Sequence, residues 1–175
     1  MELNKFTDPE KKIYSEAVIN MMCVCDNDFV PPMSARFSPF QTELSGGEST
    51  DEGILRYYKS MSKEQMLGVL ENGELLGFVT FTENLDNKAF PDSMPNIYIC
   101  TLIVKPEARG KGLTRRMYDY LFDELYPPHS LFTRTWSTNR AHITILRKYG
   151  FDEIHRIEND RAEGIDTVYF GKRRS

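Results

Sequence analysis

The chain has 175 residues, enough for one domain with a substantial core and hardly enough for two. Hydrophobic residues make up 40% and charged residues 27%, a composition typical of globular proteins and not of disordered ones. The net charge of −4 disfavours a nucleic-acid partner, which usually requires a basic surface. No apolar run is long enough to span a bilayer and no basic-then-apolar leader opens the chain, so we expect a cytoplasmic protein without a membrane partner.

Cysteine usage argues against a metal or disulfide framework. The three cysteines are an odd number, and the Cys-x-Cys spacing of Cys23 and Cys25 fits neither a zinc nor a redox motif. Cys100 lies in an apolar stretch and is expected to fill the core rather than act as a nucleophile. We therefore predict no metal site.

The first predicted element is a helix over residues 8–25. Thr7 and Glu10 have the spacing of a capping box, and Pro9 suits a first helical turn. Apolar residues then recur at helical spacing as far as Cys25. Before this helix, residues 2–6 are compatible with a short strand.

Residues 26–51 form an irregular stretch rich in proline and glycine, with three phenylalanines between them. A loop of this length usually has a function or is disordered, and the aromatic residues argue against disorder. Two interpretations stay open, a lid on the substrate side and a structural cover over the core. A short helix over 50–60 follows, with Ile54, Leu55 and Tyr58 expected to face inward.

A hairpin is predicted over residues 65–83. Two apolar runs flank Asn72-Gly73, a pair that favours a type I′ turn because both central residues need positive φ. A polar loop, 84–96, leads to a strand over 97–104 that is apolar on both faces and therefore expected at the centre of a sheet.

A glycine-rich turn connects this central strand to the next helix. Pro106 ends strand pairing because it has no N–H to donate, and Gly110 and Gly112 let the backbone turn sharply. A helix with an apolar stripe then runs over 113–125. The order of buried strand, glycine turn and helix N-terminus predicts an anion site, best suited to phosphate.

The last third of the chain supplies a strand over 131–136 and a helix over 139–149. Asn139 offers helix-capping chemistry and Gly150 ends the helix. A final hairpin is predicted from residues 151–156 and 167–171 around a polar loop. The element order predicts an α+β or mixed α/β fold, with a mainly antiparallel mixed sheet and helices on both faces.

Two nucleotide-binding motifs fail on the residues of the glycine turn. The dinucleotide fingerprint needs a third glycine at position 115, which is Arg115. The P-loop needs Ser or Thr after Gly-Lys, and Gly112 follows Lys111.

Residues 107–112, Glu-Ala-Arg-Gly-Lys-Gly, instead resemble the pyrophosphate loop of the GNAT superfamily of acyl-CoA-dependent N-acyltransferases, Gln/Arg-x-x-Gly-x-Gly/Ala. Glu107 departs from the first position of that pattern. A second family motif, Asn-x-x-Ala-x-x-Leu-Tyr-x-Lys-x-Gly-Phe, is similar to residues 139–151, with Asn139, Lys148, Gly150 and Phe151 in register. The resemblance covers roughly residues 65–171.

This resemblance implies a GNAT-like three-layer fold and direct transfer of an acetyl group from acetyl-CoA to the amine of a small molecule or a peptide. It implies one domain over 1–175, with a helical and loop region on the acceptor side in 1–64 and the sheet and acetyl-CoA-binding core in 65–171. A non-catalytic acyl-CoA-binding or sensor domain of the same fold is the alternative. The oligomeric state, monomer or homodimer, stays open.

The resemblance also assigns residues to the coenzyme. Backbone N–H groups of the turn and the first helical residues would hold the diphosphate, with two side chains adding charge: Arg109, Gly110, Lys111, Gly112, Leu113 and Thr114. The pantetheine arm would add to the strand edge at Ile103 and Val104. Asn139 would orient the coenzyme near its thiol, and the N–H of Leu102 would stabilise the negative charge that develops on the thioester oxygen.

Proton transfer is where the sequence departs from the family. The tyrosine that often serves as general acid aligns with Leu146, so His142 or Tyr149, one turn away on the same helix face, is a candidate replacement or a core residue. The position of the family's glutamate base matches Tyr98, a poor base at neutral pH. Glu83, another loop carboxylate (Asp86 or Asp92) or a water chain would then take the proton.

The acceptor itself is open. Acidic residues gather in the segments expected on the acceptor side, which suggests a cationic amine or merely solvated loop charges: Asp26, Asp28, Glu43, Glu48, Asp51, Glu83 and Asp86. A protein N-terminus or lysine is the rival to a small molecule.

Overall fold

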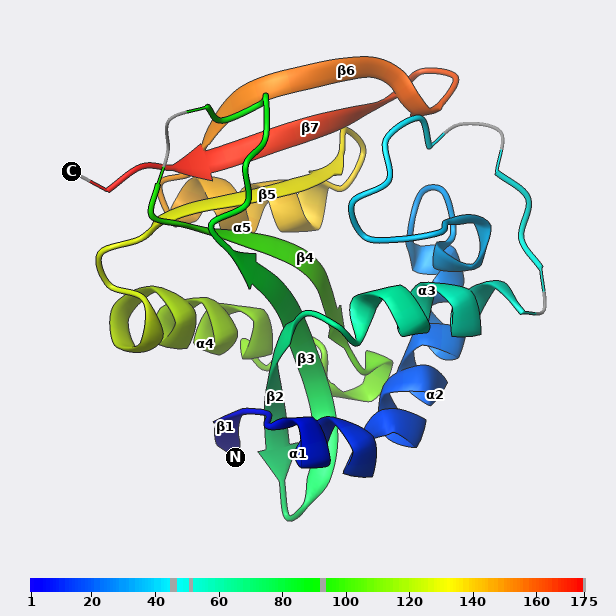
Figure 1. Cartoon of the computed structure of the whole chain (residues 1–175), viewed down its shortest axis with the longest axis vertical. Coiled ribbons are helices and arrows are strands. Elements are labelled where there is room, and N and C mark those ends of the chain that lie inside the picture. Colours follow the sequence, from blue (N-terminus) through cyan, green and yellow to red (C-terminus); the bar gives the residue numbers. More distant parts are fainter. Residues whose placement is uncertain (45–46, 51, 92–93, 175) are drawn as a thin grey trace.

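A computed structural model describes residues 1–44, 47–50, 52–91 and 94–174. Within these ranges seven strands form one sheet in the order β1-β2-β3-β4-β5-β7-β6 (Figure 1). Neighbouring strands are antiparallel except β4 and β5, which are parallel. The strands are β1 (Glu2–Lys5), β2 (Gln65–Glu71), β3 (Glu74–Glu83), β4 (Asn96–Val104), β5 (Ser130–Trp136), β6 (Asp152–Ala162) and β7 (Ile165–Lys172).

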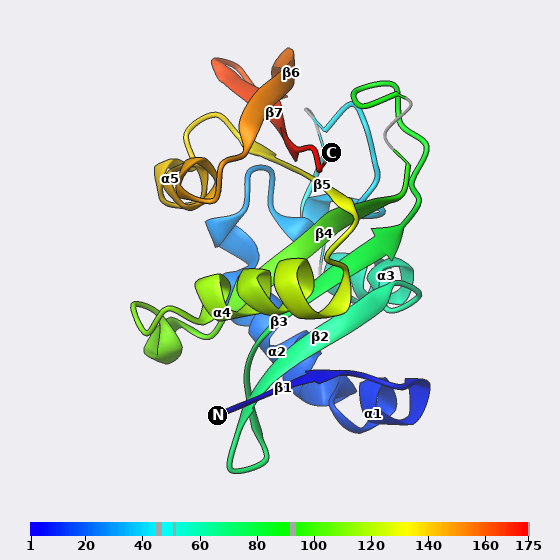
Figure 2. The same ribbon diagram turned by 90° about the vertical axis from the view of Figure 1, so that its left-hand side faces the viewer.

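Helices cover both faces of the sheet. In Figure 2, α4 lies in front of the sheet and α2 lies behind it. The helices are α1 (Asp8–Ile13), α2 (Ser15–Cys25), α3 (Gly53–Met61), α4 (Leu113–Asp119), which continues as a π-helical turn (Tyr120–Leu125), and α5 (Arg140–Lys148). Short 3-10 turns lie at η1 (Asp26–Asp28), η2 (Met33–Ala35) and η3 (Pro106–Ala108). This arrangement confirms the predicted fold class.

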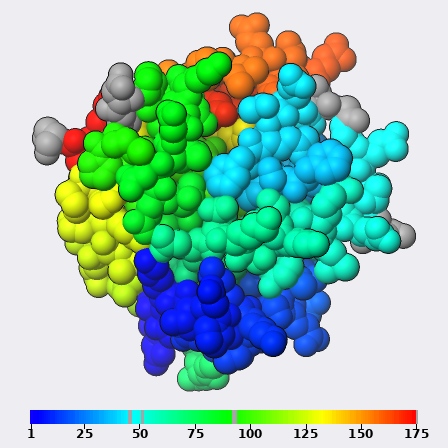
Figure 3. Space-filling view, viewed as in Figure 1, coloured from blue at the N-terminus to red at the C-terminus, as the bar shows by residue number. Residues whose placement is uncertain are grey.

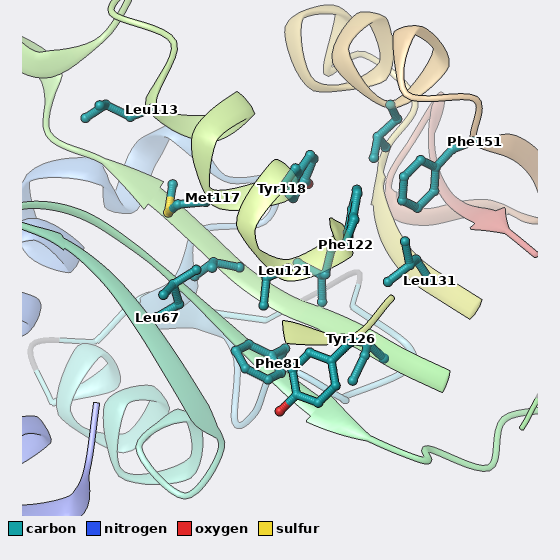
Figure 4. Packing of buried hydrophobic residues seen from close by; sticks show 14 of the residues in the cluster. Leu67, Phe81, Leu113, Met117, Tyr118, Leu121, Phe122, Tyr126, Leu131 and Phe151 are labelled. Carbon is teal, nitrogen blue, oxygen red and sulfur yellow. The ribbon is translucent and has the colours of Figure 1, made fainter. Parts of the chain in front are cut away.

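The largest hydrophobic cluster lies between the sheet and the α4–α5 layer. Tyr118 and Phe122 stack with ring centroids 5.1 Å apart, and Phe122 meets Phe151 at 5.7 Å (Figure 4). Met117 and Leu121, in the same helical segment, are fully buried as well. Since truncating such a buried aromatic residue typically costs about 3–5 kcal/mol, this cluster fixes α4, and the loop before it, against the sheet.

Several sequence predictions are confirmed. The hairpin over 65–83 forms around Asn72 and Gly73, both at positive φ, and the predicted strands at 97–104 and 131–136 are β4 and β5. The short N-terminal strand is β1, which pairs with β2 and so adds a strand from residues 1–64 to the sheet. None of the described helices is both long and apolar enough to cross a membrane.

Three predictions about elements are wrong. The single helix over 8–25 is two helices, because the chain turns at Tyr14, which ends α1 and precedes α2. Leu55 does not face inward but is 55% exposed, and the buried face of α3 is formed by Ile54 and Tyr57. The polar loop expected at 158–166 belongs mostly to β6 and β7, because β6 is an edge strand whose largely exposed residues give no hydrophobic alternation.

Candidate active site

The two parallel strands separate after four residues. β4 and β5 are paired from Asn96 to Ile99, and the rest of β4 diverges from β5 like one arm of a V (Figure 1). The register of β4 with β3 shifts at the same place, because Ile99 is opposite Phe81 while Thr101 is opposite Thr80, which leaves Cys100 as an extra residue. Such a bulge bends a strand, so it accounts for the separation.

The bent half of β4 presents free backbone groups to the opening. The N–H of Lys105 donates to Leu76 of β3 at 2.9 Å, and alternate residues of a strand direct their backbone groups to the same side. The N–H groups of Leu102 and Val104 therefore point away from β3. The carbonyl of Val104 also points away from β3, because it accepts a hydrogen bond from Nε of Arg109 at 3.2 Å. The predicted oxyanion donor, Leu102, is on the open edge.

The glycine turn has the predicted conformation. Gly110 and Gly112 both have φ of +75°, a backbone conformation that residues other than glycine rarely adopt. α4 begins directly after Gly112, and the first intrahelical bond is donated by Arg116, so the N–H groups that precede it have no intrahelical partner. A Cβ atom at either glycine would meet nothing within 4 Å, so the space above the turn is open.

Two adjoining cavities occupy this region. The strand cavity, about 320 Å³, lies between the diverging halves of β4 and β5 and is lined by Leu102, Ile103, Arg134, Asn139, His142 and residues of α2 and η1. The loop cavity, about 660 Å³, lies over the glycine turn and reaches Lys148, the last residue of α5, and Tyr149, which follows it. They share five lining residues and so form one groove: Val104, Arg109, Thr114, Ala141 and Ile145.

Arg109 stands where the cavities meet. Its Nη2 lies 2.6 Å from Oδ2 of Asp28 in η1 and 3.3 Å from Sγ of Cys25. The hydrogen bond to Asp28 raises the pKa of Arg109, whereas burial raises the pKa of the Cys25 thiol, which stays protonated. Glu107, the first residue of the predicted loop pattern, lines neither cavity. Arg109 is therefore the basic residue of this turn that connects both halves of the groove.

His142 lines the strand cavity and is joined to the core of α4. Its Nε2 lies 2.6 Å from the hydroxyl oxygen of Tyr118. Burial lowers the pKa of His142 to about 4, so the imidazole is neutral at physiological pH, and burial raises the pKa of Tyr118. Tyr118 was not singled out from the sequence, because the stripe expected over 113–125 ran through Leu113, Met117 and Leu125 and did not include it.

Asn139 caps α5 and also lines the strand cavity. Its Oδ1 accepts from the backbone N–H of His142 at 3.2 Å, and its Nδ2 donates to Oγ1 of Thr135 at 3.0 Å. The cap fixes the first turn of α5, so Asn139 positions His142 in addition to its predicted place near the coenzyme.

The other residues predicted for proton transfer lie elsewhere. Tyr149 lines only the loop cavity, and its hydroxyl donates to Asp119 at 2.7 Å, which together with burial raises its pKa. Glu83 is opposite Ile97, at the far end of β4 from Leu102, and lines neither cavity. Its carboxylate accepts from the hydroxyl of Tyr126 at 2.6 Å, which lowers the pKa of Glu83. The structure does not bring Glu83 together with the other predicted site residues.

The two family positions that depart from the pattern are core residues. Leu146 is fully buried in the cluster under α4 and α5. Tyr98 is also buried, stacked on Phe90 at 5.7 Å, and burial raises its pKa above the usual range. Of the loop carboxylates named as alternatives, Asp86 is exposed and lines neither cavity, and Asp92 lies outside the described residues. Cys100 lines the strand cavity rather than being simple core filler.

Comparison with solved structures shows the same fold. The crystal structure of ribosomal-protein-alanine N-acetyltransferase from Brucella melitensis has a TM-score of 0.68 at 15% identity and covers 99% of this chain and 100% of that one. The structure of yncA from Salmonella typhimurium with its cofactor acetyl-CoA has a TM-score of 0.64 at 18% identity, over 99% of this chain and 93% of that one.

Sequence comparison adds a curated protein and a family. UPF0157 protein YqkA of Bacillus subtilis (strain 168) is 23% identical over 104 residues, 59% of this chain and 27% of that protein, so the chain spans about a quarter of the curated relative that it matches. The model of the acetyltransferase (GNAT) family matches residues 33–151, which is more than half of the chain. The chain therefore belongs to the GNAT acetyltransferase family.

Proposed function

We propose that this protein transfers an acetyl group from acetyl-CoA to the amine nitrogen of a small molecule or a peptide. The observation that carries the proposal is the continuous groove. One end is the glycine turn at the start of α4, the other is the open backbone edge of β4, and Arg109 lies between them.

The residues of the groove fit acetyl-CoA. The loop cavity offers unpaired N–H groups and open space above Gly110 and Gly112, which suits a diphosphate. Lys111 and Lys148 are exposed beside this turn and at the cavity rim, where they add positive charge. The free edge of Leu102 and Val104 offers the pattern of donors and acceptors that an amide-containing arm needs.

Acetyl-CoA supplies a thioester, whose acyl carbon is activated for attack by a nitrogen. The Leu102 N–H, on the open edge, donates to the oxygen that becomes negative as the nitrogen attacks. When Tyr118 donates its hydroxyl proton to His142 Nε2, the ring proton is on Nδ1. That Nδ1–H has no partner among the described residues, so His142 can donate a hydrogen bond to the departing sulfur, which takes up the proton that the acceptor nitrogen releases.

No carboxylate among the described lining residues is free to take the proton of the acceptor nitrogen. Asp28 is the one acidic residue among the described lining residues of the two cavities, and it is bound to Arg109. A water path through the open groove is the remaining route for the proton.

The second candidate, an acyl-CoA-binding or sensor domain without turnover, is favoured by this same lack of a free base. The experiment that separates the two measures thiol release from acetyl-CoA with a panel of primary amines, alongside acetyl-CoA binding. Amine-dependent thiol release supports acetyl transfer. Saturable binding of acetyl-CoA with no amine-dependent release supports the sensor, and absence of binding rejects both.

A further inference from the structure

We propose that the acceptor carries a carboxylate close to its amine, and that Arg134, supported by Arg36 and Arg161, recognises this anionic group. The inference rests on the proposed acetyl transfer and names its class of acceptor. It starts from three arginines that the fold gathers from distant parts of the chain, after η2, on β5 and on β6.

The three guanidinium groups are withdrawn from solvent. Arg36 is 6% and Arg161 3% exposed, and Arg134 is half-buried with its side chain lining the strand cavity. Burial, followed by the charges of Arg36 and Arg134, lowers the pKa of Arg161 to about 9. Arg36 and Arg134 therefore lie close enough to Arg161 to destabilise its charge.

These arginines form no ion pair within the described part of the chain. They donate mainly to backbone carbonyls, Arg134 to Pro39 at 2.8 Å and Gln41 at 2.6 Å, and Arg161 to Val30 at 3.0 Å. Arg36 donates to Pro31 at 3.0 Å. Neutral carbonyls satisfy donors but leave the charge uncompensated.

Two nearby carboxylates, Asp160 and Asp26, attract Arg161 and Arg36 but form no ion pair with them. Asp160 accepts from the hydroxyl of Thr167, and Asp26 accepts from the backbone N–H and the hydroxyl of Ser34 at 2.9 and 2.6 Å. Three positive charges exceed these two negative ones, and an excess of buried charge is costly, so an anion that enters the strand cavity is favoured.

Arg134 is the member that reaches the cavity. Its Nε donates no hydrogen bond within the described residues, and Thr133 and Thr135, on either side of it in β5, also line the cavity. The free Nε–H can therefore donate a charge-assisted hydrogen bond to a carboxylate oxygen in the cavity.

The acidic residues that favoured a cationic acceptor do not gather in the site. Asp26 and Asp28 are bound by Ser34 and Arg109. Asp51 lies outside the described residues. The remaining acidic candidates line neither cavity: Glu43, Glu48, Glu83 and Asp86. The charge that the fold leaves uncompensated in the strand cavity is positive.

Positive charge beside the acceptor also helps the reaction. A nearby cation disfavours the ammonium form of an amine and lowers its pKa. A larger fraction of the acceptor is then the neutral amine, which is the nucleophile. This matters because Asp28, the one carboxylate among the described residues that line the cavity, is bound to Arg109.

The arginines have a structural role as well. Arg36, Arg134 and Arg161 all bind carbonyls of residues 30–41, part of the pale-blue segment that covers the middle of the molecule's face in Figure 3. Arg56 of α3 does the same, donating to the Ser34 carbonyl at 3.1 Å, but it does not line either cavity. Arg56 is therefore the matched control for a purely structural effect.

The first test uses the unaltered protein with acetyl-CoA and pairs of acceptors that differ only in charge. The pairs are α-amino acids and their α-carboxamides, with phosphoethanolamine and ethanolamine as a phosphate arm. We expect kcat/KM at least about tenfold higher for the carboxylate members, because a charge-assisted contact is lost in the amides. Equal rates, or preference for the amides, overturn the inference while leaving acetyl transfer intact. A preference confined to the phosphate arm overturns the carboxylate assignment.

If no pair turns over, the same pairs are titrated by calorimetry into protein saturated with coenzyme A. Tighter binding of the carboxylate members supports the inference, and equal or absent binding overturns it. Failure of the proposed function is seen separately, as lack of acetyl-CoA binding or as binding without thiol release for any amine of the panel.

The second test compares Arg134→Gln, Arg134→Lys and Arg56→Gln, each checked for folding by thermal unfolding. Arg134→Gln should raise KM for the carboxylate members about tenfold and change KM for the amides and the Kd of acetyl-CoA little, whereas Arg134→Lys should retain part of the preference. If Arg56→Gln abolishes the preference equally, the arginines act through the covering segment and the inference fails.

Discussion

The hydroxyl oxygen of Tyr118 lies 2.6 Å from Nε2 of His142, across the contact between α4 and α5. Tyr118 is fully buried and stacked on Phe122, so its hydroxyl is fixed in direction. His142 in turn is held by the Asn139 cap at the start of α5. The pair therefore presents a neutral, oriented imidazole to the strand cavity.

His142→Ala should lower kcat by about a hundredfold, the size typical of removing one oriented donor to a developing negative charge. Tyr118→Phe should lower it less, by about tenfold, because the imidazole remains but loses the partner that fixes its tautomer. Tyr149→Phe should act mainly on the KM for acetyl-CoA, since Tyr149 lines only the loop cavity. Steady-state kinetics with acetyl-CoA varied at saturating acceptor measure all three. Unchanged kcat in both His142→Ala and Tyr118→Phe would mean that His142 does not stabilise the departing sulfur.

Stability should depend on pH through His142. Its pKa falls from 6.5 to about 4 on folding, so between these values the unfolded chain binds more protons than the folded one. The free energy of unfolding therefore rises with pH across this window and is lost as pH falls, by up to roughly 3 kcal/mol and less where cavity water screens the ring. Urea titrations at pH 4.5 and 7 should show a smaller difference for His142→Gln than for the unaltered protein. An identical difference contradicts the assignment of a neutral buried imidazole.

Leu146→Tyr should destabilise the fold rather than supply a general acid. Leu146 is fully buried among side chains of the α4–α5 cluster, and inserting a larger side chain into a packed core typically costs about 1–3 kcal/mol. Thermal unfolding and kcat together decide this. A stable variant with a raised kcat would show that the site can receive the family's tyrosine at position 146.

The Arg109–Asp28 ion pair should have a small effect on the affinity for acetyl-CoA. Both side chains are about half exposed, and ion pairs of this kind are worth about 1 kcal/mol or less. Asp28→Asn should tighten acetyl-CoA binding by up to about fivefold, because it frees Arg109 and removes a negative charge near the diphosphate. Arg109→Gln should weaken binding. Calorimetry measures both affinities. Weaker binding of acetyl-CoA by Asp28→Asn would contradict this prediction and indicate that Asp28 holds Arg109 in its binding position.

The sequence predicted the elements whose signals are local. Alternating apolar residues identify β4, Asn72-Gly73 identifies the hairpin turn, and Gly110 and Gly112 identify the loop before α4. Each signal depends on a residue's own backbone preference or on its immediate neighbours, so no tertiary information was needed. The order of these elements was enough for the fold class.

The site depended on contacts that periodicity does not record. Tyr118 and His142 are 24 positions apart on different helices, and Arg36, Arg134 and Arg161 come from three elements. Whether a carboxylate is free also depends on its partner, as Asp28 and its bond to Arg109 show. Residue types alone therefore left a cationic acceptor and merely solvated charges open, whereas the contacts of these residues lead us to propose an anionic group on the acceptor.

The central claim is that the turn at Gly110 and Gly112 holds the diphosphate of acetyl-CoA. The most direct measurement is calorimetric titration of acetyl-CoA into the unaltered protein, into Gly112→Asp and into Gly73→Asp. Gly73 is the matched control, because it also has positive φ and open space but lies in the β2–β3 turn. We expect saturable binding to the unaltered protein and to Gly73→Asp, and loss of binding in folded Gly112→Asp because its carboxylate repels the phosphates. Equal affinity in all three proteins, or no binding to the unaltered protein, would contradict the account.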